Sequence, residues 1–368
     1  RGAASAASVA ATMSDSLISS MYAVGNVVSS VALVLLNKRV FAGGFYYPMT
    51  LSCFHFAFTI IFYQLLAAFN VFSKPAIDMP QTEKFKVAFA GFASIGFMNL
   101  SLSTNSVGFY QITKLVIIPV TLVINYYFYS VSTTPKVKLS LLILLAGVGV
   151  ATVTDVQLKL LGLGFGVAAV VTTAMFQIWQ GTKQKDYGLS GTQLQSSIAP
   201  WQAMQALVVA GSSEMVCWSA EPCVTTLDYF AEASEPTHAH TLTLVLGTCF
   251  LALLVNWCSF GLIGRTSPIT FQVVGHAKTC LVLVGGYVLF PVKEGNEQQF
   301  YNNIAGVAVA FIGCILYGHV KYAATAGTDD CLDQCCPGPI VRALDPTKLS
   351  TVSPSETEGL TVRMATIK

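Results

Sequence analysis

The chain has 368 residues, of which 54% are hydrophobic and only 10% are charged, with a mean hydropathy of +0.63. Soluble domains contain about 25% charged residues, so this composition excludes a soluble protein. The net charge of +2 gives no indication of a nucleic-acid partner. The alternating pattern of barrel strands is absent, so helices are the expected membrane-spanning elements.

Apolar runs long enough to cross a membrane recur along the chain. A spanning helix needs about 20 mostly apolar residues. The sequence predicts ten such helices, at residues 16–36, 47–70, 86–104, 107–129, 138–154, 160–180, 195–215, 241–263, 268–291 and 302–320. We expect residues 1–15 to be a disordered leader and 323–368 to be a disordered, polar tail. Met13 is a candidate start, with the first span as its own insertion signal.

The charged residues between the spans predict the orientation of the chain, because basic residues favour the cytosolic side of short loops. One set of alternate loops carries eight basic residues, Lys74, Lys84, Lys86, Lys136, Lys138, Lys183, Lys185 and Arg265. The other set carries four, Lys38, Arg39, Lys159 and Lys293. We therefore expect both termini in the cytosol. The longest loop, 218–239, has four acidic and no basic residues and is expected in a lumen.

Several familiar chemical motifs are missing or misplaced. The ten cysteines show no paired spacing typical of a metal site. Cys217 and Cys223 would be able to form a disulfide if their loop faces an oxidising lumen. The GLGFG stretch, Gly162 to Gly166, lacks the spacing of a dinucleotide-binding loop, so we interpret it as close helix packing. Neither H-E-x-x-H nor G-x-S-x-G occurs, which argues against an enzyme, and no cofactor or metal is expected.

Two short stretches indicate an internal repeat. SVGFYQ (106–111) enters the fourth span and SPITFQ (267–272) enters the ninth. Both read Ser, three residues, an aromatic residue and Gln, and a lysine follows each. Two halves of five spans, 16–154 and 160–320, must be inverted with respect to each other because five is odd. We therefore predict an all-α membrane protein of two inverted five-helix repeats, with a site at the midplane as in many transporters.

The lysines that follow these stretches are the most informative residues. Lys114 and Lys278 are the only formally charged residues in the fourth and ninth spans. A charged side chain at a helix centre costs about 2.5–3.5 kcal/mol. Snorkelling to the interface is an alternative for Lys114, which is nearer a helix end. It suits Lys278 poorly, because Arg265 and Lys293 each lie about 20 Å away by helical rise.

A buried ion pair is the second alternative for these lysines. Of the 18 acidic residues, only Glu214 falls within a predicted span, in the last turn of the seventh, and Asp155 follows the end of the fifth. No carboxylate is therefore expected at mid-membrane. We interpret Lys114 and Lys278 as the cationic part of a central site for an anion, to which a doubly charged phosphate or a diphosphate is suited.

Other polar side chains are expected near the same depth. Any one of them is more often an interhelical hydrogen bond than a ligand contact. Together they suit the base and ribose of a nucleotide, which need hydrogen bonds and an aromatic ring to stack on. Besides the two lysines, the predicted substrate-binding residues are Tyr110, Gln111, Thr113, Gln272, His276, Thr279, Asn256, Asn37 and Lys38. Lys38 has the alternative role of an anchor at the interface, and His276 is expected to be neutral.

Longer motifs carry a resemblance to a known family. FYQITKLVIIP (109–119), TDVQLKLLG (154–162), TSPITFQVVGHAKTCLVLVGGY (266–287) and the LLNK that ends the first span resemble the nucleotide-sugar transporter and triose-phosphate translocator family. The resemblance covers about residues 16–320 and is closest to plant and algal transporters for UDP-xylose and for UDP-rhamnose/UDP-galactose. Lys278-Thr279 is similar to the Lys-Thr dipeptide that names one subgroup.

This resemblance implies the ten-helix drug/metabolite transporter fold and antiport by alternating access. A UDP-sugar is expected to enter the Golgi lumen in exchange for UMP. Family lysines on the fourth and ninth helices bind phosphate, and these correspond to Lys114 and Lys278. The phosphate translocators typically have Lys-Arg on the ninth helix. Thr279 in place of the arginine favours a nucleotide over a bare phosphorylated three-carbon compound.

Several alternatives stay open at this point. A plastid exchanger of triose phosphate or phosphoenolpyruvate for phosphate is the runner-up in the same class. An anion channel and a non-transporting membrane scaffold are alternatives of a different class. The residues do not decide between UDP-xylose, UDP-galactose and UDP-rhamnose, or between the Golgi, the endoplasmic reticulum and the plastid envelope. Besides the UDP-sugar and UMP, membrane lipid is an expected partner, and both a monomer and a homodimer are compatible with the sequence.

Overall fold

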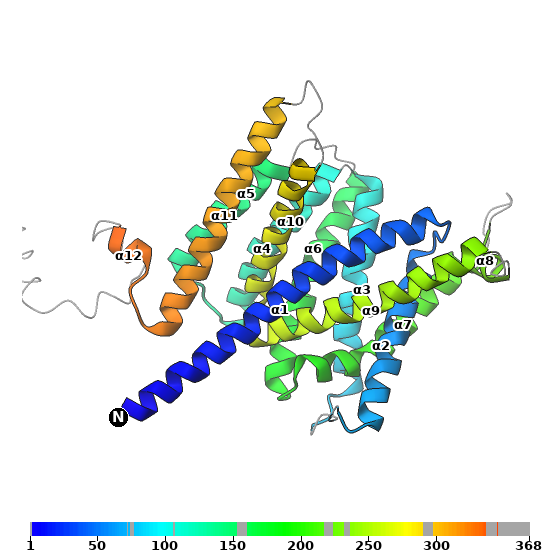
Figure 1. Cartoon of the computed structure of the whole chain (residues 1–368), viewed down its shortest axis with the longest axis horizontal. Helices are drawn as coiled ribbons and strands as arrows, with labels where there is room; N and C mark the ends of the chain where they lie inside the picture. The colour runs from blue at the N-terminus through cyan, green and yellow to red at the C-terminus, as the bar shows by residue number, and fades with distance from the viewer. Residues whose placement is uncertain are drawn as a thin grey trace, which may run out of the picture. The chain divides into compact units, whose positions relative to one another are not determined.

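The computed structural model describes residues 2–71, 73, 77–105, 107–152, 160–216, 224–231, 236–289, 297–335 and 344. All regular structure in these residues is helical (Figure 1). The helices are α1 (Gly2–Ala42), α2 (Pro48–Ala68), α3 (Gln81–Thr104), α4 (Val107–Tyr129), α5 (Pro135–Thr152), α6 (Leu160–Asp186), α7 (Gly191–Ser213), α8 (Thr226–Ala231), α9 (Pro236–Arg265), α10 (Pro268–Leu289), α11 (Glu297–Ala326) and α12 (Cys331–Cys335).

Each predicted apolar run coincides with one long helix. Over the described residues, seven helices are long and apolar enough to cross a membrane, namely α1, α2, α4, α5, α6, α9 and α11. α3, α7 and α10 are not among them; α7, for example, carries four glutamines within its 23 residues. The architecture is that of a multi-pass, all-helical membrane protein. Ten spans remain a prediction.

The chain divides into two compact units, residues 1–124 with 152–290, and residues 125–151 with 291–368. In the first unit α1 packs along α9, α2 along α7 and α3 along α6. Buried polar side chains link these helices, and the Nδ2 of Asn26 on α1 donates to the Oγ of Ser259 on α9 at 2.8 Å. Such bonds are a common means of joining helices where lipid offers no hydrophobic drive between them.

The GLGFG stretch is a packing surface, as interpreted from the sequence. A Cβ at Gly162 would strike the side chain of Asn105, and one at Gly166 would lie 2.9 Å from the ring of Phe109. The two glycines lie one helical turn apart on the same face of α6. Because neither has a side chain, neighbouring residues can approach this face closely.

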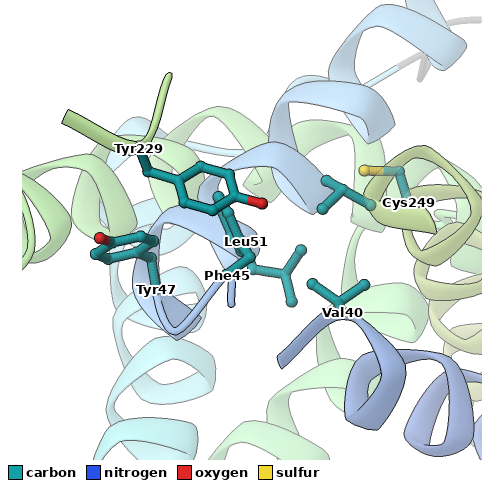
Figure 2. Close-up of a cluster of buried hydrophobic side chains, with 7 residues drawn as sticks. Val40, Phe45, Tyr47, Leu51, Tyr229 and Cys249 are labelled. Atoms are coloured by element: carbon teal, nitrogen blue, oxygen red, sulfur yellow. The ribbon is translucent and has the colours of Figure 1, made fainter. Parts of the chain in front are cut away.

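An apolar cluster closes one end of the first unit, between the α1–α2 turn, α8 and α9. It consists of Val40, Phe45, Tyr47, Leu51, Tyr229, Val245 and Cys249 (Figure 2). The Tyr47 hydroxyl lies 3.0 Å from the carbonyl oxygens of Val224 and Thr225. This contact ties the described part of the loop predicted to face a lumen to the start of α2. Cys217 and Cys223 lie outside the described residues.

Glu214 follows the last turn of α7 and caps another helix. Its carboxylate accepts from the backbone amides of Met49 and Thr50 at 2.7 Å each, and from the Thr50 hydroxyl at 2.8 Å. A carboxylate at a helix N-terminus satisfies free amides and is favoured by the helix dipole. The one acidic residue inside a predicted span is therefore engaged in holding α2 to α7. Asp155, the other acid near a span, lies outside the described residues.

A second carboxylate joins α3 to α6. Glu83, in the first turn of α3, accepts from Lys86 and from Lys183 of α6 at 2.9 Å each. Hydrogen bonds from Lys86 and Lys183 lower the pKa of Glu83 below its ordinary value. The stabilisation is therefore present at neutral pH and is lost only as the pH falls through the lowered pKa.

In the second unit, α5 and α11 touch backbone to backbone. A Cβ at Gly147 of α5 would strike the backbone of Ala310, and one at Gly306 of α11 would lie 2.5 Å from the nitrogen of Ala151. Small residues at such crossings allow helices to approach closely in a membrane.

A buried ion triad attaches the chain beyond α11 to α5. Lys136, which was counted among the loop residues, is the second residue of α5, and its Nζ lies 2.9 Å from Asp330 and 2.6 Å from Asp333. Asp330 also accepts from the backbone amide of Leu332, and Asp333 accepts from that of Asp330. The first part of the expected disordered tail is thus ordered as α12, because its two carboxylates find a cation and free amides.

The close crossing of α5 and α11 is testable with alanine. Gly306→Ala should destabilise the detergent-solubilised protein by about 1–3 kcal/mol, because the added methyl strikes backbone atoms that cannot move aside. Gly318→Ala on the same helix has open space around its Cβ. It should be neutral or slightly stabilising, because alanine favours a helix over glycine. Equal melting temperatures for the two variants would contradict the crossing.

The ion triad predicts that removing the charge of Lys136 will destabilise the protein, whereas removing the charge of a neighbouring exposed lysine will not. Lys136→Met should cost about 3–5 kcal/mol, since it leaves two buried carboxylates without their cation. Amide hydrogen exchange of residues 330–335 should then rise sharply. Lys138→Met is the matched control, because Lys138 is exposed on the same turn of α5. Unchanged exchange in Lys136→Met would show that other contacts hold α12.

Candidate functional site

Lys114 lies in the second turn of α4 and is half-buried. Its Nζ stands 4.3 Å from the centre of the Tyr110 ring, one turn earlier. A cation over an aromatic face gains electrostatic attraction without losing its charge. The ammonium group is therefore positioned by a neutral partner, and this contact brings no negative charge to compensate it.

Lys278 lies near the middle of α10 and is also half-buried. α10 begins in a way its sequence predicts, with Pro268 in the first turn and the Ser267 hydroxyl accepting from the amide of Thr270 at 3.1 Å. In the part of the chain that the structure describes, no ion pair involves Lys278 or Lys114.

The structure brings the two lysines and His276 into one region. Lys114 lies near enough to Lys278 and His276 for its charge to affect both, in addition to the larger effect of their own burial. His276 is only 5% exposed, and its Nε2 has no hydrogen-bond partner among the described residues. An unsatisfied buried polar atom costs about 1–3 kcal/mol. A ligand that forms a hydrogen bond with this imidazole would therefore recover that free energy.

Gln272 lies one turn before His276 and contacts a residue that the sequence reasoning missed. Its Nε2 donates to the Oε1 of Gln177 on α6 at 2.8 Å, and both side chains are more than nine-tenths buried. A signal for Gln177 was present, because Gln177 and Gln180 at the end of the sixth apolar run, and Gln184 beyond it, recur at the spacing of one helical face. All three are buried in the structure.

The two predicted threonines use their hydroxyl hydrogens within their own helices. Thr113 donates to the carbonyl of Phe109 at 3.0 Å, and Thr279 donates to that of Gly275 at 3.2 Å. Each oxygen keeps a lone pair with which to accept from a ligand.

The remaining predicted residues are not joined to the lysines by any contact in the described part of the chain. Gln111 of α4 and Asn256 of α9 are half-buried. Asn37 of α1 is half-buried too, and its buried Oδ1 has no partner among the described residues. The side chain of Lys38 lies outside the described residues. Their part in a site stays a prediction.

The chemistry of this region suits anion binding. Two cations close together repel each other, and an anion between them removes the repulsion and gains two charge-assisted hydrogen bonds. Among the described residues, no three His, Cys, Asp or Glu side chains are grouped to hold a metal ion.

The sequence of most of the chain matches a known protein family. The sequence profile of the Triose-phosphate Transporter family matches residues 18–318. The chain belongs to the Triose-phosphate Transporter family. The match confirms the resemblance seen in the sequence motifs and has nearly the extent that they suggested.

Curated members of the family are similar over most of their length. UDP-xylose transporter 1 of Arabidopsis thaliana is 38% identical over 295 residues, which are 80% of this chain and 81% of the relative. UDP-xylose transporter 3 of the same plant is 39% identical, over 80% of this chain and 78% of the relative. UDP-rhamnose/UDP-galactose transporter 1 is 34% identical over 300 residues, 79% of this chain and 80% of the relative.

The repulsion between the lysines predicts that one substitution will stabilise the empty protein. Lys278→Met should raise the unfolding free energy of the ligand-free protein by roughly 0.5–2 kcal/mol, the range typical of single stabilising substitutions. Thermal unfolding in phosphate-free detergent buffer measures the change. Lys185→Met, at an exposed lysine of α6, is the control and should have no effect. A lowered melting temperature for Lys278→Met would show that the charge is compensated within the protein.

Proposed function

We propose that this protein is a nucleotide-sugar antiporter that exchanges a UDP-sugar for UMP by alternating access. The observation that carries the proposal is the pair of half-buried lysines, Lys114 and Lys278, with no ion-pair partner among the described residues. Both cargoes present doubly charged phosphate groups, which two lysines can neutralise. Several of the similar Arabidopsis proteins are named as transporters of UDP-xylose or of UDP-rhamnose/UDP-galactose, and a UDP group is common to these cargoes.

The pairing of helices supports an inverted repeat. If α1–α5 form one repeat and α6, α7, α9, α10 and α11 the other, then α1 corresponds to α6 and α3 to α9. The α1–α9 and α3–α6 pairs of the first unit are then counterparts of each other. α4 and α10 also correspond, and these are the helices that carry Lys114 and Lys278. A pseudo-twofold axis would thus place the lysines on opposite sides of one cargo.

Exchange follows from the charges in this scheme. When the site is empty, closing it would bury two cations that repel each other, which is costly at low dielectric. Either a UDP-sugar or UMP neutralises them, so only a loaded carrier changes its facing direction readily. A ligand can drive such a change only through its different affinity for the states involved.

We further propose that the protein lies in the Golgi membrane with both termini in the cytosol and imports the UDP-sugar into the lumen. Support comes from the basic residues at helix ends. Lys183 and Lys185 occupy the last turn of α6, and Arg265 ends α9. All three belong to the loops expected on the cytosolic side.

The proposal is tested by counterflow into liposomes. Vesicles preloaded with UMP should take up labelled UDP-xylose, UDP-galactose or UDP-rhamnose, and unloaded vesicles should not. Lys278→Met should reduce uptake by about 10- to 100-fold, the effect of losing one charged hydrogen bond at a buried site. Lys185→Met should retain the normal rate.

Other outcomes separate the alternatives. Exchange of triose phosphate or phosphoenolpyruvate against phosphate would establish a plastid-type exchanger instead. A conductance that needs no counter-substrate would establish a channel. A protein that exchanges none of these, with Lys278→Met indistinguishable from the unmodified chain, would be a scaffold.

A further inference from the structure

The Gln177–Gln272 pair has hydrogen-bonding capacity left over. One bond joins the two amides, from Nε2 of Gln272 to Oε1 of Gln177. No other hydrogen bond of either side chain is formed with the described residues. The pair therefore keeps the Nε2 donors of Gln177, the Oε1 acceptor of Gln272 and one further N–H. Neither the Nε2 of Gln177 nor the Oε1 of Gln272 is among the described atoms that are wholly buried without a partner, so each keeps exposed surface through which a ligand can bind.

The pair lies beside the cationic site without being part of it. Gln272 precedes Lys278 by six residues, about 9 Å along a helix. Gln272, His276 and Thr279 recur at the spacing of one helical face of α10. This face is polar but has no formal charge, and it begins at the amide pair and ends level with the lysine.

A UDP-sugar has a neutral base next to a charged diphosphate, which matches the order of neutral amide and lysine along α10. Its charge lies in the middle, at the diphosphate, and neutral groups flank it on both sides. UMP shares the uracil and a phosphate but lacks the sugar, so a subsite used by both cargoes is a base subsite. The edge of uracil presents an N–H donor at N3 beside carbonyl acceptors, which suits an amide acceptor beside an amide donor.

We propose that Gln177 and Gln272 together bind the uracil ring of the cargo and set the preference for uridine nucleotides. This inference rests on the proposed exchange of a UDP-sugar for UMP. Cytosine carries an acceptor at N3 and an amino group at C4, which reverses the uracil pattern. The hydrogen bond between the amides leaves the Nε2 of Gln177 as a donor and the Oε1 of Gln272 as an acceptor, which match uracil. A base with the reversed pattern requires both amides to turn over together or leaves groups unpaired in the closed site, so uracil is favoured.

The test measures the contribution of the base separately from that of the phosphate. Uptake of the labelled UDP-sugar is inhibited with UMP, with CMP and with ribose 5-phosphate, which has the phosphate and ribose but no base. In the unmodified protein UMP should inhibit at much lower concentrations than the other two. In Gln177→Leu and Gln272→Leu the advantage of UMP over CMP and over ribose 5-phosphate should fall at least about fivefold, the lower bound for one good base contact. Inhibition by ribose 5-phosphate itself should stay unchanged.

A matched control separates recognition from stability. Gln195 is another buried glutamine whose Oε1 accepts an interhelical hydrogen bond, from the hydroxyl of Tyr63 at 2.9 Å. Gln195→Leu should lower the melting temperature while leaving the UMP advantage intact. If the leucine variants at 177 and 272 do not fold, Gln177→Asn and Gln272→Asn shorten the amides by one methylene, and the same ratio decides.

The two proposals fail in different ways. An unmodified protein that exchanges no uridine nucleotide would overturn the proposed function. Normal exchange with a UMP advantage unchanged in the variants at both glutamines would overturn only the base subsite, and the pair would then be an interhelical contact alone.

Discussion

The proposed function depends on two lysines, Lys114 and Lys278, that lie near each other without an ion-pair partner among the described residues. Both side chains lie on apolar helices, both are half-buried, and the charge of one acts on the other. Such an arrangement is unfavourable for the protein by itself. It persists where function requires it, in the same way that strain is kept at functional sites. In the proposed function the cost of the empty site becomes binding energy for an anion, and family membership agrees with a role in transport.

The described acidic residues near the helices are placed so that the lysines keep their charge uncompensated. Glu214 caps α2, and Glu83 pairs with Lys86 and Lys183 at the ends of α3 and α6. Asp330 and Asp333 pair with Lys136 at the first turn of α5. Each of these carboxylates binds backbone amides or lysines at a helix end and so stabilises the packing of the helices. Among the described residues around Lys114 and Lys278, the polar groups are therefore amides, hydroxyls and the imidazole of His276.

Hydropathy and charge counting predicted the long helices and singled out both lysines, because a lone charge in an apolar run is visible without any knowledge of contacts. The same methods missed Gln177, since its importance depends on a partner 95 residues away. They also placed Lys136 in a loop and its partners in a disordered tail, because an ion triad across 194 residues leaves no local pattern. The capping role of Glu214 was equally hidden, although its position at the end of the seventh run was correct.

A division of roles between charged and neutral groups follows from the antiport scheme. Two cargoes that exchange through one site must both satisfy its cations, so the lysines respond to what the cargoes share and cannot distinguish sugars. Neutral groups with fixed donor and acceptor positions distinguish between ligands better than lysines do. A ligand that does not match them leaves them without hydrogen bonds at low dielectric, which is costly. In the proposed exchange, UMP carries no sugar and still has to be bound for the return step. In this scheme the contacts to phosphate and base are expected to supply most of the binding energy. The names of the transporters for UDP-xylose and for UDP-rhamnose/UDP-galactose agree with this, since their sugars differ while the UDP group is the same.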